Sequence, residues 1–266
     1  PSPPGVIESG EVLYGEEDLL KVSERRMREI RGKHISMVFQ DPMTSLNPVM
    51  TVGDQIAEVL QNHENLHTKE AQHRACEMLE MVGINADRAG EYPHQFSGGM
   101  KQRVVIAIAL ACRPRLLIAD EPTTALDVTI QAQVLEIMKR LRQELNMTMM
   151  LITHDLGVVA QNCDNVAIIY AGEIVEYGTV HEIFKERAHP YTIGLFDSIP
   201  KLNEDVTRLK PILGLMPDPT DLPCGCKFHD RCQYCTEECK AHVPEMSQLS
   251  PTHQVRCIHW KEVAAK

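Results

Sequence analysis

Short apolar runs that alternate with longer helical patterns are the feature that most limits how this chain can fold. Four runs are expected to form strands buried on both faces: residues 35–39, 116–119, 149–152 and 166–170. Between the second and third runs, residues 129–145 repeat apolar side chains at helical spacing and carry charges on the opposite face. Strands that alternate with helices of this length indicate βαβ crossovers, and hence an α/β fold around a parallel sheet.

The same patterns divide the chain into four parts. Residues 1–50 are predicted to form the first part of the sheet core, and residues 51–114, which show helical patterns only, a helical insert. Residues 115–187 are predicted to complete the core. Prolines recur through residues 188–266, which are expected to form a separate extension.

Composition narrows the classes of function. Hydrophobic residues make up 43% of the 266 residues, which is ample for a core. Asp and Glu outnumber Lys and Arg by 37 to 27, and this net charge of -10 disfavours nucleic acid, because such binding rests on cations that neutralise phosphates. The longest apolar run, Val104–Cys112, is far shorter than the roughly 20 residues of a membrane span. With no secretory signal pattern, we expect a reducing compartment.

Two adjacent carboxylates, Asp120 and Glu121, follow the second predicted strand. Ligands bind at the carboxyl ends of strands in open α/β sheets. There, one carboxylate can hold Mg²⁺ while its neighbour orients or deprotonates an attacking water. Acidic pairs after strands are common, so this pair alone is a weak signal.

A second candidate site is Ser97-Gly98-Gly99, which precedes an apolar helical stretch. Glycines at the start of a helix allow backbone amides to approach an anion closely. The alternative is an ordinary serine cap followed by flexible glycines, which would be favoured for these three residues taken alone.

The order of these motifs resembles that of the ATP-binding subunits of ABC transporters. The matching features are Gln40 (the Q-loop glutamine), Phe96-Ser97-Gly98-Gly99-Met100 (the signature motif), Leu116 to Asp120 (the Walker B strand), Ala125-Leu126-Asp127 (the D-loop) and His154 (the switch histidine). The resemblance implies a P-loop NTPase core with a helical subdomain. It also implies binding of ATP and Mg²⁺.

Within this class, three segments resemble the dipeptide, oligopeptide and nickel importers: residues 39–48, 92–100 and 189–192. The resemblance implies that Glu121 is the catalytic base, that Asp120 and Gln40 bind Mg²⁺ and nucleotide, and that His154 senses the γ-phosphate. It further implies that Ser97, Gly98, Gly99 and Gln102 contact the nucleotide of a second ATPase subunit, and that Asp127 belongs to the D-loop.

The phosphate-binding pattern G-x-x-x-x-G-K-[ST] does not occur among the 266 residues. The one Gly-Lys pair, Gly32-Lys33, is followed by His34 and does not fit this pattern. By the resemblance, the loop lies before the position matched by Pro1. We therefore expect an N-terminally incomplete subunit that is inactive alone.

Six of the nine cysteines lie between residues 224 and 257. Four of them, Cys226, Cys232, Cys239 and Cys257, are candidate metal ligands, with Cys224 and Cys235 left over. From the residues alone, zinc and an iron–sulfur cluster are equally favoured, and free structural thiols are the third alternative. The family resemblance implies a [4Fe-4S] cluster. His229, His242, His253 and His259 could substitute as ligands, but most are expected to be solvated surface residues.

The leading functional hypothesis is an ATPase subunit that powers dipeptide or oligopeptide import. Its implied partners are a second ABC ATPase, membrane permease subunits and, indirectly, an external substrate-binding protein, with no nucleic acid. The resemblance implies that the subunit lies at the cytoplasmic face of the membrane. The alternatives are a catalytically incomplete ABC fragment, or an ABC-type ATPase that acts outside transport.

Overall fold

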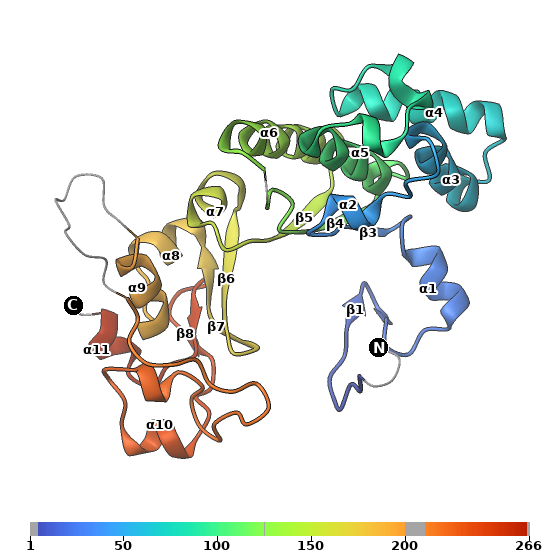
Figure 1. Ribbon diagram of the computed structural model, residues 1–266. Coiled ribbons are helices and arrows are strands. Elements are labelled where there is room, and N and C mark those ends of the chain that lie inside the picture. The colour runs from blue at the N-terminus through green and yellow to red at the C-terminus, as the bar shows by residue number, and fades with distance from the viewer. Residues whose placement is uncertain (1–4, 125, 200–210, 265–266) are drawn as a thin grey trace. The chain divides into compact units, whose positions relative to one another are not determined.

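The computed structural model describes residues 5–124, 126–199 and 211–264 of the chain (Figure 1). It consists of two compact units, residues 1–154 and 155–266. The four-part division expected from the sequence stays a prediction. Ala125 of the predicted D-loop lies outside the described residues.

A parallel three-stranded sheet forms the centre of the first unit. Strands β3 (Ile35–Val38), β4 (Leu116–Asp120) and β5 (Thr148–Ile152) lie in the order β3-β4-β5. In register, Val38 is opposite Ala119 and Asp120 is opposite Ile152, so all three strands end at one edge. The α/β class and the parallel sheet predicted from the sequence are confirmed.

Two features of the predicted strands are wrong. The strand at 166–170 does not join the parallel sheet, because it pairs antiparallel with the strand that follows it in the second unit. The prediction that every strand is buried on both faces also fails. Met150 and Ile152 on β5 are 53% and 45% exposed, and Ile169 is 61% exposed. An apolar run in the sequence shows only that the side chains are apolar. It does not show which face of the strand other helices or strands cover.

Between β3 and β4 lies the helical part of the first unit. It comprises α2 (Pro42–Ser45), α3 (Val52–Glu64), α4 (Thr68–Met81) and α5 (Gly98–Leu110), with short 3-10 turns at Ala86–Gly90 and Pro93–Gln95. Helices α3, α4 and α5 pack against one another around the buried residues Ile56, Leu79 and Ile106. This helical insert agrees with the sequence pattern. Helix α4 begins at Thr68, and His67 before it has the extended N-cap conformation.

The remaining elements of the first unit flank this core. The short hairpin β1 (Leu13–Tyr14) and β2 (Glu17–Asp18) precedes α1 (Glu24–Ile30), and Arg26 of that helix forms an ion pair with Glu17. Helix α6 (Val128–Glu144) connects β4 to β5 and buries Val134, Met138 and Leu141, as its periodicity predicts.

The second unit is built on an antiparallel sheet. Strands β6 (Asn165–Tyr170), β7 (Glu173–Thr179), β8 (Ser247–Gln248) and β9 (Gln254–Val255) lie in the order β6-β7-β9-β8. Its helices are α7 (Leu156–Asn162), α8 (Val180–Lys185), α9 (Pro190–Asp197), α10 (Glu237–Ala241) and α11 (Trp260–Ala264), with a 3-10 turn at His229–Arg231. Because β9 pairs with β7, residues 254–255 are part of the same sheet as residues 165–179.

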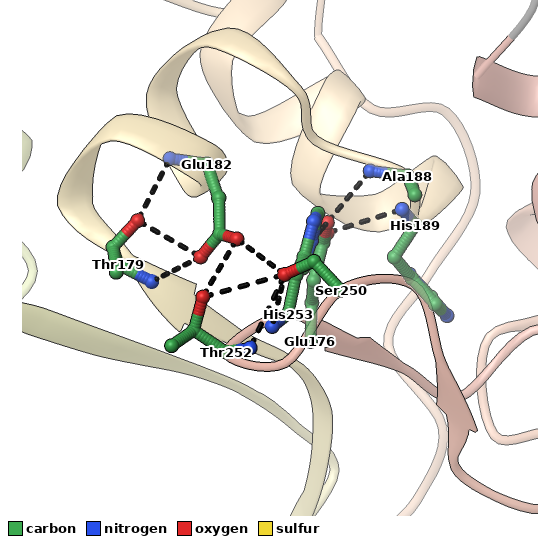
Figure 2. A network of polar contacts seen from close by, with 8 residues as sticks. All are labelled: Glu176, Thr179, Glu182, Ala188, His189, Ser250, Thr252 and His253. Carbon is green, nitrogen blue, oxygen red and sulfur yellow. Dashed lines mark hydrogen bonds and ion pairs between the residues drawn. The ribbon is translucent and has the colours of Figure 1, made fainter.

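Two carboxylates fix this pairing, and Figure 2 shows their contacts. Glu176 on β7 is fully buried and accepts hydrogen bonds from the backbone N–H groups of Ala188 and His189, at 2.6 and 3.0 Å. Its Oε1 lies 2.9 Å from His253 Nε2, and His253 is 2% exposed. Buried polar groups are stable only when they are hydrogen-bonded, and this arrangement satisfies that condition. His253 is therefore not one of the solvated surface histidines expected from the sequence.

Glu182 makes the second set of contacts, at the start of α8 (Figure 2). Thr179 and Glu182 form a capping box, in which the Thr179 N–H and hydroxyl both donate to Glu182 Oε2 at 2.8 Å. The hydroxyls of Ser250 and Thr252 donate to Oε1 at 2.6 and 2.8 Å. These hydrogen bonds, with that of Ser250 the largest contribution, lower the pKa of Glu182 to about 2.

We therefore expect the second unit to lose stability in acid. A carboxyl group whose pKa is lower in the folded state stabilises the fold above its ordinary pKa of 4.5, and this contribution is lost as the pH falls towards 2. Urea unfolding between pH 6 and pH 3 measures the loss. Ser250→Ala removes the largest contribution, so its stability should depend less on pH over this range. Equal pH dependence in both proteins would contradict the assignment.

Candidate functional site

Three of the predicted site residues lie together at the carboxyl edge of the parallel sheet. Gln40 follows β3, Glu121 follows β4 and His154 follows β5. Gln40 Nε2 donates to Glu121 Oε2 at 2.9 Å, and His154 Nδ1 lies 3.0 Å from Glu121 Oε1. Parallel strands bring residues that are distant in sequence to one edge, which is where ligands bind in such sheets.

The backbone of Glu121 has an unusual conformation. Its φ of 42° lies in the left-handed region, which residues other than glycine seldom adopt. The Glu121 N–H donates to the carbonyl of Ile152 at 2.9 Å, so the residue continues the β4–β5 hydrogen bonding as the chain turns. Strained residues of this kind cluster at functional sites.

The Glu121 carboxylate is charged at neutral pH. Hydrogen bonds from His154 and Thr124, with a smaller one from Gln40, lower its pKa from the ordinary value. Its side chain is 24% exposed and that of His154 is 77% exposed, so the cluster opens to solvent. A partly accessible, ionised carboxylate beside an exposed imidazole can orient a water molecule and accept its proton.

Asp120 is the last residue of β4 and lies at the same edge. Carboxylate oxygens suit Mg²⁺, which is commonly bound by one or two carboxylates together with substrate phosphates and water. Among the described residues, no group of three or more His, Cys, Asp or Glu side chains could hold a metal ion. The donor type therefore fits Mg²⁺ only when the phosphates of a nucleotide supply further ligands.

The signature residues begin α5. Ser97 is the N-cap residue, but its hydroxyl makes no capping hydrogen bond. An added Cβ at Gly99 would overlap the Ile130 side chain, so this glycine allows α5 to approach α6 closely. Gln102 lies one turn into α5 and is 1% exposed. It is therefore buried, whereas Ser97 and Gly98 are exposed.

Asp127 has a structural contact in this chain. Its carboxylate accepts a hydrogen bond from the Ile130 N–H at 3.0 Å and caps α6. A side chain that caps a helix contributes about 1 kcal/mol to stability. The role of Asp127 in contacting a second subunit stays a prediction.

The four predicted cysteine ligands line one small apolar cavity in the second unit. Cys226, Cys232, Cys239 and Cys257 share its wall with His189 and other residues. The Cys226 N–H donates to the Cys239 carbonyl at 2.8 Å, which brings these two segments together. Cys224, by contrast, is exposed and does not line the cavity.

The geometry of this cavity does not support the predicted metal. None of the described residues form a group of three or more potential ligands suited to a metal ion. Burial raises the pKa of Cys257 to about 12 and that of Cys232 to about 11. The described residues therefore give no support to the predicted [4Fe-4S] cluster or to zinc.

One residue of the site was not found from the sequence. Thr124 donates its hydroxyl proton to Glu121 Oε2 at 2.8 Å, and its N–H donates to the Glu121 carbonyl at 3.1 Å. The available signal was a threonine three residues after the second carboxylate, within a turn. A hydroxyl at this spacing commonly bonds to the start of its own turn.

Comparisons with known proteins agree with this arrangement. The family profile "ABC transporter" matches residues 3–124, and the profile "Oligopeptide/dipeptide transporter, C-terminal region" matches residues 175–239. The dimeric ATP-binding cassette MJ0796, bound to ADP and Pi, has a TM-score of 0.58 and is 29% identical; the alignment covers 65% of this chain and 74% of that one. CbiO1 from Clostridium perfringens, part of an ABC transporter complex, has a TM-score of 0.60 and is 30% identical. The alignment covers 67% of this chain and 69% of that one. The fold and the site thus define an ABC-type ATPase.

Similarity to whole curated proteins narrows the class. The oligopeptide transport ATP-binding protein AppD of Bacillus subtilis is 50% identical over 98% of this chain and 80% of its own length. The dipeptide transport ATP-binding protein DppD of the same organism is 49% identical over 94% of this chain and 76% of its own length. The chain therefore belongs to the oligopeptide and dipeptide family of ABC transporter ATP-binding proteins. None of the helices in the described ranges has both the length and the hydropathy that crossing a bilayer requires.

Proposed function

We propose that this chain is the ATP-hydrolysing subunit that powers import of dipeptides or oligopeptides through an ABC transporter. The convergence of Gln40, Glu121 and His154 at one sheet edge carries the ATPase part of the proposal. The peptide part is supported by the names of relatives that are about 50% identical over nearly the whole chain.

In this proposal Glu121 is the general base. Its ionised carboxylate would orient the attacking water and accept a proton from it, while His154 would contact the γ-phosphate, and Gln40 and Asp120 would hold Mg²⁺ and nucleotide. Bound Mg²⁺ supplies charge neutralisation on the phosphates. Because phosphoryl transfer has a loose transition state, positioning and electrostatics account for most of the catalysis.

We propose further that two ATPase subunits share each nucleotide. The Ser97-Gly98-Gly99 segment would contact the nucleotide held by the second subunit, and it is suited to this because the Ser97 hydroxyl makes no capping bond and Gly98 is exposed. The solved cassette MJ0796 is dimeric, which supports this arrangement by similarity.

The remaining partners follow from transport. We propose that the subunit binds permease subunits at the cytoplasmic face of the membrane, acts with an external substrate-binding protein and binds no nucleic acid. Residues 1–266 include no phosphate-binding loop pattern, so the expectation that these residues alone do not hydrolyse ATP stays a prediction. The four-cysteine metal centre also stays a prediction. Its one supporting observation is that the four thiols line one cavity.

Reconstitution tests the function. An importer assembled with this ATPase in proteoliposomes should take up labelled dipeptide or oligopeptide only when ATP is present on the side of the ATPase. Uptake of Ni²⁺ instead of peptide would contradict the proposed substrate class. Hydrolysis with no uptake of either, together with retention of the subunit on RNA, would favour an ATPase that acts outside transport.

A further inference from the structure

Thr124 is attached to Glu121 through both its backbone and its side chain. Its N–H donates to the Glu121 carbonyl at 3.1 Å, and its hydroxyl donates to Glu121 Oε2 at 2.8 Å. Thr124 lies only three residues after Glu121 in the same turn. The hydrogen bond between their side chains is therefore local, and no other helix or strand is needed to form it.

The other two partners of the carboxylate are differently placed. Gln40 shares Oε2 with Thr124, at 2.9 Å, and His154 lies against Oε1 at 3.0 Å. Gln40 and His154 come from the ends of two other strands, and both are exposed. In the proposed function, His154 would contact the γ-phosphate and Gln40 would bind the nucleotide and Mg²⁺. They cannot then serve as fixed partners of Glu121 during hydrolysis.

The backbone of Glu121 makes a fixed partner necessary. Its φ of 42° is costly for a residue with a side chain, and such a conformation persists only where the surroundings hold it. The Ile152 carbonyl fixes the N–H of Glu121, but nothing in that contact fixes the carboxylate. Thr124 is the partner that connects the turn to the carboxylate itself.

We propose that Thr124 is a positioning residue that holds Glu121 Oε2 during ATP hydrolysis and leaves Oε1 free to accept the proton of the attacking water. This inference rests on the proposed function. In the step itself, the water O–H bond breaks, its proton moves to Oε1 and its oxygen bonds to the γ-phosphorus. The bond from that phosphorus to the departing ADP oxygen breaks.

The test compares three variants in the assembled importer. Thr124→Val keeps the shape of the side chain and removes the hydroxyl, so kcat for ATP should fall roughly tenfold, a part of the 10²- to 10⁴-fold that a general base contributes. KM for ATP, and ATP binding measured by fluorescence, should not change. Thr124→Ser keeps the hydroxyl and should restore most of kcat. Thr123→Val is the matched control, because Thr123 is not among the side-chain partners of Glu121.

The outcomes separate this inference from the proposed function. If Glu121→Gln abolishes hydrolysis while Thr124→Val keeps full kcat, the role of Thr124 is wrong and that of Glu121 stands. If Glu121→Gln keeps full hydrolysis, the proposed role of Glu121 fails first. A Thr124→Val defect that appears equally in ATP binding, or that Thr124→Ser does not relieve, shows a general disturbance of the turn and overturns the positioning role.

Discussion

Replacing Glu121 by Gln is expected to lower kcat for ATP hydrolysis by the assembled importer by roughly 10²- to 10⁴-fold, the range that general-base catalysis contributes. The amide has nearly the same shape as the carboxylate but cannot accept a proton at neutral pH. In the structure Glu121 Oε2 accepts hydrogen bonds from Gln40 and Thr124, and Oε1 lies against His154. An amide oxygen can keep part of this network, so ATP binding should persist.

Steady-state hydrolysis and equilibrium ATP binding, measured on the same preparation, check this prediction. Glu144→Gln is a suitable control, because this glutamate lies on α6, is 53% exposed and lies 3.8 Å from Arg140. The control should hydrolyse ATP at the wild-type rate. Wild-type turnover by Glu121→Gln would remove Glu121 from the role of base. Loss of ATP binding would show that the side chain mainly stabilises the nucleotide site.

The cluster at the sheet edge could be predicted because its members follow three strands of one parallel sheet. Gln40, Glu121 and His154 each lie within two residues of the end of an apolar run, and parallel strands end at one edge. Residues that are far apart in the sequence could therefore be expected to lie close together at this edge. The same logic located the helical insert and α6, whose apolar periodicity decides which face is buried.

Other features depend on contacts that no local pattern encodes. The strand at 166–170 has the same apolar composition as the parallel strands, yet it pairs with its neighbour through a short turn at Ala171 and Gly172. Both turn residues have positive φ, at 47° and 82°. Such turns favour an antiparallel hairpin, and this signal was available in the sequence as a glycine after the apolar run.

The Glu176–His253 pair could not be predicted, because its partners are separated by 77 positions. A glutamate within a strand is ordinarily read as solvent-facing, and a histidine near cysteines as a surface group or a ligand. Their burial depends on β9 pairing with β7, which only the folded chain shows. The pair holds the last part of the chain against residues 173–189.

Replacing Glu176 by Ala is expected to destabilise the second unit by about 3–5 kcal/mol, the cost of breaking a buried pair by removing one partner. Three donors lose their acceptor in the variant: His253 and the backbone N–H groups of Ala188 and His189. The single tryptophan of the chain, Trp260, packs with Ala188 in one small apolar cluster. Its fluorescence during urea unfolding therefore reports on this unit.

Glu186→Ala is the matched control, because the Glu186 side chain is 64% exposed and lies 3.8 Å from the exposed His181. An exposed pair of this kind contributes about 0–1 kcal/mol, so the control should unfold almost like the wild type. The double variant Glu176→Ala, His253→Ala should be less destabilised than the sum of the two single variants, because contacting partners do not act additively. Strict additivity, or a Glu176→Ala effect as small as that of the control, would show that this pair does not hold the segment around His253 against β7.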